Sequence, residues 1–466
     1  MANQKPGSDT TGCNSTRRRT GRRRTRVTIA RAIRAARPEL ELGTCAIPAE
    51  YSGTMTGELT RVAMVSMHTS PTSQAGRGDA GGMNVAILAT ARALAARGLE
   101  VDLLTRAEAE PVAVELAPGV VLRTLAAGPA RPVSKAELAD VTDDFGEAVA
   151  TLVGRVQPRY QVLHAHYWLS GLATLPVALE LGLPFVQSFH TLAAMKNRSL
   201  ADGDTPEPDR RRFTEGYLAN QADAIVAGSA PEVDSLIDDL RAPADKLWVI
   251  PPGVDTELFT PARAVNSAAV RRALGLHAVR PLVVVAARIQ PLKGQDLAVM
   301  AMAEVAVMRG SAPVLVFAGE PTAGAELYRA SVIALAEDLG VEVAMVGSLD
   351  QQTLANLFAA ASVTLVPSHS ETFGLVALES AASGTPVVGS RSTGLVASIS
   401  DGQSGMLLAS RDPREWARAI SALLDDPHRL AELGESARAH AEGFTWATAA
   451  ASLMGVYQSL LPSPAI

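Results

Sequence analysis

The sequence predicts an α/β protein with two doubly wound parallel sheets, and three observations support this fold class. Short apolar runs alternate with helical segments, as in the strand expected at 61–67, the helix at 82–97 and the strand at 99–105. The series breaks once, at Pro251-Pro252-Gly253, and then resumes. A chain of 466 residues is also too long for one ordinary hydrophobic core. Strands and helices that alternate in this way form parallel sheets covered by helices on both faces.

These features divide the chain into four expected segments. They are a disordered basic extension at 1–58, a Rossmann-like domain at 59–256, a second at 257–440, and a C-terminal helix in 441–466 that packs back on the first domain. Doubly wound sheets bind ligands at the carboxyl ends of their strands, so the cleft between the two domains is the expected site. Further strands are expected at 162–165, 184–189, 224–227, 247–250, 282–287, 314–318, 343–346, 362–366 and 385–389.

Composition excludes several classes of protein. Hydrophobic residues make up 47% of the chain and aromatic residues only 4%, which suits an α/β protein packed with Ala, Val and Leu. No apolar run reaches the roughly 18 residues that span a bilayer, so we expect no membrane insertion. The two cysteines, Cys13 and Cys45, precede the expected domains, so those domains have neither disulfides nor a cysteine metal site. This pattern fits a cytoplasmic location.

Charge is distributed unevenly along the chain. Residues 1–40 hold Lys5 and ten arginines against Asp9 and Glu39, a net charge of +9, which leaves −15 for the rest of a chain whose total is −6. An acidic body argues against a nucleic-acid-binding protein. The basic start is polar and rich in turn residues, so disorder is the favoured interpretation, and a basic arm for RNA or a membrane is the alternative.

Two acids eight residues apart give the sharpest functional signal. Glu371 precedes, and Glu379 lies within, a helix of small residues expected at 375–383. The N–H groups of a first helical turn bind phosphate, and carboxylates on either side accept hydrogen bonds from hydroxyls. Eight helical residues span about 12 Å. A nucleoside-diphosphate sugar matches this order, because its diphosphate lies between the hydroxyls of the hexose and those of the ribose.

Two cations form a second candidate group. Arg288 and Lys293 follow the first strand of the second domain. Arg binds a diphosphate as a fork and Lys as a point charge, although a solvated surface loop is the alternative for these residues taken alone.

The loop at 68–84 is a third candidate, because its glycines let the backbone approach a ligand. It has neither the G-x-G-x-x-G nor the G-x-x-x-x-G-K-[ST] spacing. Gly81-Gly82 alone could be a tight turn, but the neighbouring His68, Asp79 and Asn84 favour a binding site.

Histidines end two strands of the first domain. His190 is a candidate catalytic or orienting group, whereas a structural role is the commoner outcome for His164 or His166. Their spacing matches no zinc motif. The run Arg210-Arg211-Arg212 is either a solvated helix face or a phosphate site.

These motifs resemble a known family. The E-x₇-E acids, the R-x₄-K cations and the glycine-rich loop resemble retaining glycosyltransferases of the GT-B fold, the glycogen-synthase-like group, from about residue 60 to the end. Four ordered blocks resemble, more narrowly, the D-inositol-3-phosphate glycosyltransferases of mycothiol biosynthesis, and they are 67–71 with 78–84, 166–171, 190–197 and 204–207.

The resemblance implies a GT-B enzyme that transfers N-acetylglucosamine from UDP-GlcNAc to 1D-myo-inositol 3-phosphate with retention, as a cytoplasmic homodimer without a catalytic cofactor. It implies that the first domain binds the acceptor, through His68, Asp79, Ala80, Gly81, Gly82, Met83, Asn84, Lys135, Tyr167, Thr191 and Arg211. It places the donor on Gln74, Ala75, Gly82, Arg288, Lys293, Leu349, Glu371 and Glu379. Lys135, Thr191 and Arg211 would hold the acceptor phosphate.

The implied mechanism is front-face attack, in which the donor phosphate takes the acceptor proton. Arg288, Lys293 and the helix dipole would stabilise the leaving UDP, Glu371 would bind sugar hydroxyls, and His190 would support the positive sugar ring. A structural Mg²⁺ is also implied, held largely by the backbone of Phe358, Ala359, Ala361 and Thr385.

The chain departs from the family pattern at two positions, and two rival functions stay open. Thr372 replaces the usual Ser, and 393–396 reads Thr-Gly-Leu-Val in place of Gly-Gly-Leu-Pro. One rival is the same chemistry with another donor or acceptor, as in a mannosyl or sucrose-phosphate-type transferase. The other is a non-catalytic protein that binds a nucleotide sugar or RNA.

Overall fold

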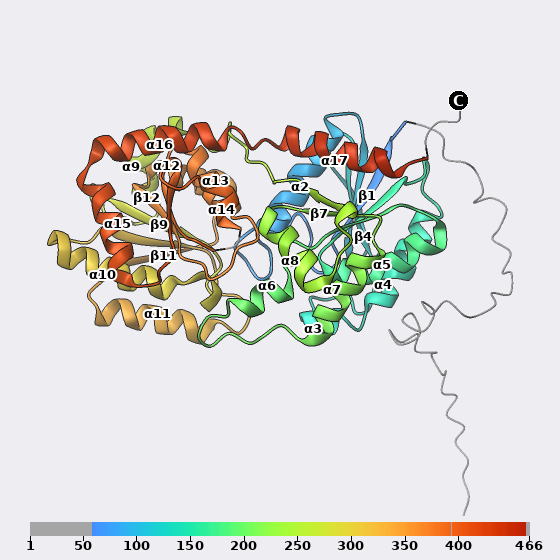
Figure 1. Ribbon diagram of the computed structural model, residues 1–466, viewed down its shortest axis with the longest axis horizontal. Coiled ribbons are helices and arrows are strands. Elements are labelled where there is room, and N and C mark those ends of the chain that lie inside the picture. Colours follow the sequence, from blue (N-terminus) through green and yellow to red (C-terminus); the bar gives the residue numbers. More distant parts are fainter. Residues whose placement is uncertain (1–57, 393, 463–466) are drawn as a thin grey trace, which may run out of the picture. The chain divides into compact units, whose positions relative to one another are not determined.

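The computed structural model describes residues 58–392 and 394–462 (Figure 1). The basic extension expected at 1–58 falls outside them except for Glu58, as do both cysteines and Thr393. No helix in the described ranges has the length and apolar character needed to cross a membrane.

The first half of the described chain is built on an eight-stranded sheet in the order β3-β4-β2-β1-β5-β6-β7-β8. All its neighbouring strands are parallel except β3, which pairs antiparallel with β4 at one edge. The strands are β1 (Arg61–Val65), β2 (Glu100–Arg106), β3 (Ala113–Ala117), β4 (Val120–Leu125), β5 (Val162–His166), β6 (Phe185–Ser188), β7 (Ala224–Ala227) and β8 (Leu247–Val249). The helices are α2 (Gly82–Ala95), α3 (Lys135–Leu138), α4 (Thr142–Val153), α5 (Trp168–Leu181), α6 (Ala193–Arg198), α7 (Asp209–Gln221) and α8 (Ala230–Leu240).

The second half is built on a six-stranded sheet in the order β11-β10-β9-β12-β13-β14, with every pair parallel. Its strands are β9 (Leu282–Ala286), β10 (Val314–Ala318), β11 (Val343–Gly347), β12 (Val363–Val366), β13 (Val387–Ser390) and β14 (Gly405–Leu408). Its helices are α9 (Ser267–Ala273), α10 (Gln295–Arg309), α11 (Glu326–Asp338), α12 (Gln351–Ala360), α13 (Leu375–Ala382), α14 (Leu395–Ser398), α15 (Pro413–Asp425) and α16 (Pro427–Ala441).

The last helix, α17 (Trp446–Leu460), belongs by packing to the first half. It lies beside α2 in Figure 1, and its buried Leu453 and Val456 share a hydrophobic cluster with Val62 of β1 and Ile87 of α2. Tyr457 of this helix is fully buried in the same cluster. The chain therefore crosses from the first sheet to the second and returns.

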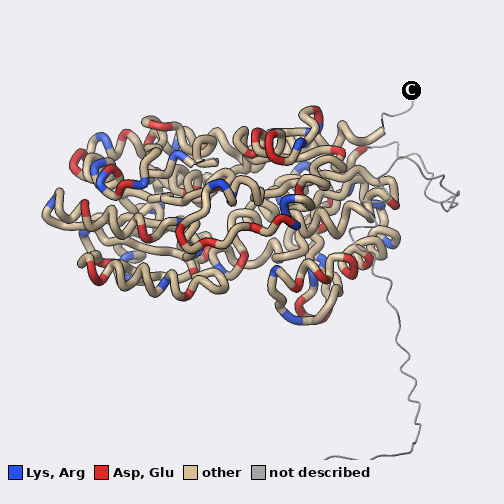
Figure 2. Tube along the Cα trace, turned by 60° about the horizontal axis from the view of Figure 1, so that its bottom comes forward, with Lys and Arg blue, Asp and Glu red and all other residues tan. Residues whose placement is uncertain are grey.

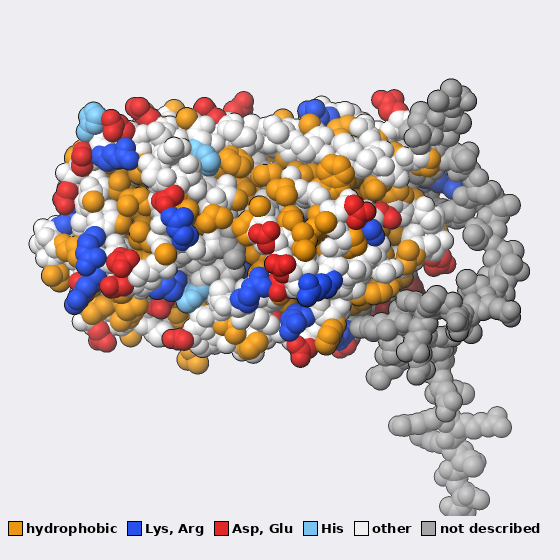
Figure 3. Space-filling model, in the orientation of Figure 1, with side chains coloured by type: hydrophobic (Ala, Val, Ile, Leu, Met, Phe, Trp, Pro, Cys, Tyr) orange, Lys and Arg blue, Asp and Glu red, His pale blue; other side chains and the backbone are white. Residues whose placement is uncertain are grey.

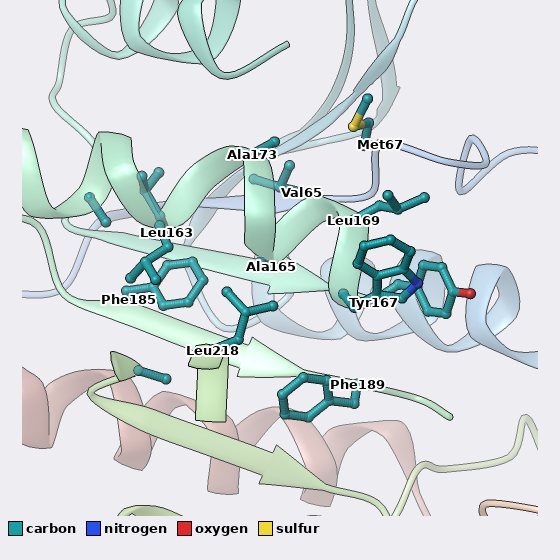
Figure 4. Close-up of a cluster of buried hydrophobic side chains, with 14 of the residues drawn as sticks. Val65, Met67, Leu163, Ala165, Tyr167, Leu169, Ala173, Phe185, Phe189 and Leu218 are labelled. Atoms are coloured by element: carbon teal, nitrogen blue, oxygen red, sulfur yellow. The ribbon is translucent and has the colours of Figure 1, made fainter. Parts of the chain in front are cut away.

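A core of aliphatic and aromatic side chains fixes the first sheet beneath α5. Val65 of β1, Leu163 of β5 and Phe185 of β6 pack with Leu169 and Ala173 of α5 in this cluster (Figure 4). The strands are uniformly buried, which is typical of parallel strands covered on both faces. This packing sets the carboxyl ends of β5 and β6, from which the first half presents its polar residues.

The sequence predictions for the fold hold with three omissions. Every expected strand is present, with ends that shift by at most two residues. The edge pair β3–β4 and the strand β14 were not predicted. The parallel-sheet fold class is confirmed, and β3 departs from it only at the edge, where a short turn at Gly119 returns the chain antiparallel to β4.

Charged residues of both signs alternate along the described chain. The Cα trace in Figure 2 and the face shown in Figure 3 both carry Lys and Arg interspersed with Asp and Glu. Neither view shows the single-sign basic stripe that is typical of a nucleic-acid-binding surface.

Candidate active site

A cavity of about 690 Å³ lies between residues of the two halves, at the carboxyl ends of their strands. The first half lines it with the loop before α2, and the second with the loops after β9, β11 and β12. All eight residues expected to contact the donor line it, and they are Gln74, Ala75, Gly82, Arg288, Lys293, Leu349, Glu371 and Glu379. Of the expected acceptor residues, only Gly81 and Gly82 line it.

Hydrogen bonds cross between the two halves at the rim of the cavity. The amide of Gln74 donates to the carbonyl of Ser348 over 3.3 Å, and the Ser348 hydroxyl donates to the carbonyl of Ala75 over 3.0 Å. The N–H of Glu320 donates to the carbonyl of Gly76 over 2.9 Å. These contacts hold the glycine-rich loop against the second sheet.

The helix α13 does not include both Glu371 and Glu379, because it begins only after Glu371. α13 starts at Leu375, because Gly374 has a left-handed φ of 92°, so Glu371 lies in the preceding loop and Glu379 about one turn inside the helix. The expectation that eight residues of one helix join the two acids is therefore wrong. The N–H of Ala377 already donates to the carbonyl of Gly374 over 2.9 Å, so the N–H groups of Leu375 and Val376 are the ones that remain at the helix start, between the two acids.

Glu371 is held by polar partners from two neighbouring segments. The ammonium of Lys293 lies 2.5 Å from its Oε1, and the Ser368 hydroxyl donates to the same oxygen over 2.7 Å. The main-chain carbonyl of Glu371 also accepts from the N–H of Gly394 over 2.8 Å. These bonds fix the carboxylate within the cavity wall.

Glu379 is a buried acid that faces the cavity without a countercharge. Its residue is only 7% exposed, and burial raises the pKa of its carboxyl to about 7. Within the described ranges its side chain makes no ion pair and accepts no hydrogen bond. A carboxylate in this setting is suited to accept hydrogen bonds from ligand hydroxyls, which would replace its lost hydration.

Arg288 connects the donor and acceptor sides. It follows β9, where the amide of Gln295 donates to its carbonyl over 3.0 Å, and burial lowers the pKa of its guanidinium. Its Nη1 lies 3.6 Å from Oδ1 of Asp79, and that same oxygen lies 2.8 Å from the ammonium of Lys135. The two cations hold the pKa of Asp79 below its usual value against the effect of burial.

A second group of expected acceptor residues surrounds Arg211 on α7. The guanidinium is buried and donates to both the carbonyl and the hydroxyl of Thr191, over 2.8 and 2.9 Å. It lies 4.9 Å from the ring centre of Tyr167, as in a cation–π contact. Glu207 and Glu215 neutralise it at 3.1 and 2.6 Å.

His68 lies between the Arg211 group and the Lys135 pair. Its ring centre is 4.2 Å from that of Tyr167. Burial, followed by the positive charge of Lys135, lowers the pKa of His68 to about 3, so the imidazole is neutral at pH 7. The structure thus brings His68, Asp79, Lys135, Tyr167, Thr191 and Arg211 into one region.

The remaining expected acceptor residues hold the loop itself. Asn84 accepts from the N–H of Gly81 over 3.0 Å, and its amide donates to Thr69 and to the carbonyl of Ser70 over 3.1 and 2.6 Å. The carbonyl of Ala80 accepts from the N–H of Gly76, and Met83 packs against the hydrophobic cores.

His190 has a constrained backbone and a fixed side chain. Its φ of 60° is left-handed, which is uncommon for a residue other than glycine and often marks a functional position. Its Nε2 forms a 2.8 Å hydrogen bond with Nδ1 of His166, and burial lowers its pKa to about 4. His164 instead bonds Tyr457 and Ser188, which is the structural role expected for one of this pair.

The expected magnesium residues lie together, away from the cavity lining. Phe358 and Ala359 are near the end of α12, and Ala361 follows it. The hydroxyl of Thr385 donates to the carbonyl of Phe358 over 2.6 Å, and the N–H of Ala361 donates to the same carbonyl over 2.9 Å. Carbonyl and hydroxyl oxygens are of the type that magnesium binds, but the Phe358 carbonyl already accepts two hydrogen bonds and the set has no carboxylate. The described residues contain no cluster of three or more His, Cys, Asp or Glu side chains that could hold a metal.

Two residues that act on the expected ones were not predicted from the sequence. They are Glu215, which pairs with Arg211, and Ser229, whose hydroxyl donates to the carbonyl of Thr372 from the other half. His166 and Thr372 were noted in the sequence, but their bonds to the imidazole and to the carbonyl of His190 were not expected.

Two family models match the two halves of the chain. The model described as Glycosyltransferase Family 4 matches residues 80–258, and the model described as Glycosyl transferases group 1 matches residues 267–440. The boundary between them falls where the first sheet ends and the second begins.

Several curated proteins are similar to this chain over nearly their whole length. The D-inositol 3-phosphate glycosyltransferase of Acidothermus cellulolyticus is 43% identical over 86% of this chain and 90% of its own length. The protein of the same name from Streptomyces scabiei is 41% identical, over 86% of this chain and 91% of its own.

Solved structures share the fold. Sucrose-phosphate synthase from Thermosynechococcus elongatus superposes with a TM-score of 0.78 and 29% identity, over 86% of this chain and 99% of its own. The catalytic domain of starch synthase IV from Arabidopsis thaliana gives a TM-score of 0.67 at 16% identity, over 86% and 99%. The fold is therefore GT-B, as expected from the sequence.

Proposed function

This chain belongs to the D-inositol 3-phosphate glycosyltransferase family, and from that premise we propose that it moves N-acetylglucosamine from UDP-GlcNAc to 1D-myo-inositol 3-phosphate, with retention. This reaction would be the first glycosyl step of mycothiol biosynthesis. The observation that carries the proposal is the cavity, where two cations, two acids and a helix N-terminus meet.

The donor side supports binding of a nucleoside-diphosphate sugar. Arg288, Lys293 and the first-turn N–H groups of α13 supply the positive charge that a diphosphate requires. Glu379 is assigned to the ribose hydroxyls and Glu371 to the hydroxyls of the sugar. When the bond to the sugar breaks, negative charge grows on the diphosphate, and these fixed donors stabilise it without rearrangement.

The acceptor side supports binding of a phosphorylated polyol. Lys135, Thr191 and Arg211 are assigned to the phosphate, and Asp79, Tyr167 and His68 to the region around the ring. In this structure Lys135 forms an ion pair with Asp79, and Arg211 forms one with Glu207. An acceptor phosphate would take their place as the counterion, so acceptor binding exchanges ion pairs that already exist.

The chemical step places the acceptor hydroxyl on the same face of the sugar as the leaving group. The hydroxyl oxygen bonds to the anomeric carbon as the bond to UDP breaks, and the hydroxyl proton passes to the departing phosphate oxygen. The carbonyl of His190 is assigned to the positive ring that develops. A closed cleft would exclude water and so suppress hydrolysis of the donor.

The second candidate is a transferase that uses another donor or another phosphorylated acceptor. The similarity to a sucrose-phosphate synthase supports it. The purified protein is therefore incubated with one of three donors, UDP-GlcNAc, UDP-glucose or GDP-mannose. Each donor is tested with 1D-myo-inositol 3-phosphate, with a hexose 6-phosphate and without an acceptor.

The proposal predicts nucleotide release that depends on UDP-GlcNAc together with inositol phosphate, and an α-linked product by NMR. Release with another pair, and none with this one, would favour the second candidate. Nucleotide-sugar binding without any transfer would favour a non-catalytic protein.

Magnesium has a structural role in this proposal, without a step in the reaction. Carbonyls at Phe358, Ala359 and Ala361 and the hydroxyl of Thr385 would hold it, joining the end of α12 to the turn before β13. We predict that EDTA leaves the transfer rate within about twofold and lowers the melting temperature by a few degrees or less. A rate loss above about tenfold that added Mg²⁺ restores would contradict this role.

Assembly as a cytoplasmic homodimer, without nucleic acid, remains a prediction from the family resemblance. Sedimentation equilibrium of the purified chain measures whether it is a dimer. The ratio of absorbance at the nucleic-acid and protein maxima checks that no nucleic acid is bound.

A further inference from the structure

Residue 372 makes two hydrogen bonds that join the two halves of the molecule. Its hydroxyl donates to the carbonyl of His190 over 2.5 Å, and its own carbonyl accepts from the hydroxyl of Ser229 over 2.8 Å. His190 follows β6 and Ser229 follows β7, so both partners stand at the carboxyl end of the first sheet. One residue of the second half thus contacts two neighbouring strand ends of the first.

The loop that carries Thr372 cannot move independently of the donor side. Glu371, the preceding residue, lines the cavity, and its carbonyl accepts from the N–H of Gly394. A Cβ added at Gly394 would lie 2.1 Å from the carbonyl carbon of Thr372, so the two segments are in close backbone contact. A shift of Thr372 would therefore also move Glu371.

His190 is fixed at both ends, and only one of these contacts comes from the other half. Its imidazole bonds His166 within the first half, whereas its carbonyl bonds Thr372 of the second. The left-handed φ of 60° turns this carbonyl away from a regular strand geometry. When the halves separate, the carbonyl loses its Thr372 donor while the imidazole keeps its partner.

We propose that Thr372 is a positioning residue, which fixes the His190 carbonyl only when the two halves are closed and so favours transfer over hydrolysis of the donor. This inference rests on the proposed function. The hydroxyl of Thr372 is the essential group, because it is the donor to the His190 carbonyl. Ser229 supports it by holding the main chain of residue 372 against the first half.

The competing explanation is that Thr372 only fills space at the interface. Two substitutions separate the explanations, because Thr372→Val keeps the shape of the side chain without a hydroxyl, whereas Thr372→Ser keeps the hydroxyl without the methyl group. A 10- to 100-fold loss of rate corresponds to about 1.4–2.7 kcal/mol, which is the size expected for an unmet buried hydrogen bond. Ser229→Ala removes the second hydrogen bond alone.

The experiment measures UDP release and glycosylated product separately in the wild-type chain and the three variants. We expect Thr372→Val to lower kcat about 10- to 100-fold, to change the KM for UDP-GlcNAc less than about threefold, and to raise the ratio of UDP released to product formed. Thr372→Ser should restore kcat and the ratio of UDP to product to their wild-type values. Ser229→Ala should raise that ratio less than Thr372→Val does. An unchanged ratio in Thr372→Val, or a Thr372→Ser variant as impaired as Thr372→Val, would overturn the inference.

A second measurement keeps this test separate from the proposed function. Small-angle scattering of the wild type and Thr372→Val with saturating UDP reports closure without any turnover, and melting curves verify that both are folded. If the wild type forms no product from UDP-GlcNAc and inositol phosphate, the proposed function fails. The inference is then judged by the radius of gyration, which should be larger in Thr372→Val, and equal radii would overturn it.

Discussion

The donor and acceptor sides of the cleft treat charge in different ways. On the donor side, Glu379 is buried without a countercharge and awaits a ligand. On the acceptor side, Arg211 and Lys135 are already neutralised, by Glu207 and Glu215 and by Asp79. The donor-side cations are paired as well, Lys293 with Glu371 and Arg288 with Asp79, so the two sides differ in Glu379 and not in their cations. A buried acid without a partner favours a ligand that carries hydroxyls, whereas a phosphate on either side must replace carboxylates that already neutralise the cations.

The largest effect is expected at Arg288, where the two sides meet. Arg288→Ala should lower kcat/KM about 100- to 1000-fold, because it removes a fixed hydrogen-bond donor to the diphosphate. It also leaves Asp79 with Lys135 as its remaining cation. Steady-state kinetics with both substrates measure this. Arg309→Ala on α10 is the matched control, since Arg309 pairs with Asp425 and is absent from the cavity lining. Equal rates in the two variants would contradict the assignment.

Substitution of Glu379 should weaken donor binding and yet stabilise the fold. Glu379→Gln should weaken UDP binding about 10- to 100-fold, because an ionised acceptor of hydroxyl hydrogen bonds is replaced by a neutral one. Wild-type donor binding should also weaken as the pH falls through about 7, where the carboxyl protonates. Calorimetric titration of UDP from pH 6 to 8.5 measures both effects.

The same substitution should stabilise the fold at alkaline pH. The folded pKa of about 7 lies above the ordinary value of 4.5, so the unfolded chain ionises first and wild-type stability falls as the pH rises between these values. Glu379→Gln should recover on the order of 2–3 kcal/mol at pH 8 and little at pH 4.5. Melting curves at both pH values test this, and a gain that does not depend on pH would contradict the assigned burial.

The smallest effect is expected at Lys135. Its side chain is half exposed and paired with Asp79, so Lys135→Ala should leave the melting temperature nearly unchanged. The KM for the acceptor should rise about fivefold, while the KM for the donor stays constant. A change in the donor KM alone would show that Lys135 serves the other side.

The sequence predicted the donor side better because that side is local. Arg288 and Lys293 are five residues apart, Glu371 and Glu379 eight, and each pair is placed by one turn after one strand. The strands themselves could be predicted from their continuous apolar runs. The edge strand β3 could not, because three of its five residues are exposed and it lacks such a run.

The contacts that complete the site could not be derived from sequence patterns. Thr372 bonds His190 across 182 positions of the chain and Ser229 across 143, so only tertiary packing brings them together. Glu215 is separated from Arg211 by a single helical turn, yet nothing in that spacing shows that the pair is buried beside Thr191. The helix start at Leu375 was predicted, but the left-handed φ of Gly374 was not, and because of it Glu371 and Glu379 are not joined by one helical span.

Equilibrium binding of UDP tests the division between the two sides most directly. Asp79 lies between Lys135 and Arg288, and we assign these two cations, which share one carboxylate, to different ligands. Calorimetric titration of UDP into the wild type, Arg288→Ala and Lys135→Ala separates them. We predict that UDP affinity falls at least about tenfold in Arg288→Ala and stays within about twofold of wild type in Lys135→Ala. An equal loss in both variants would contradict it.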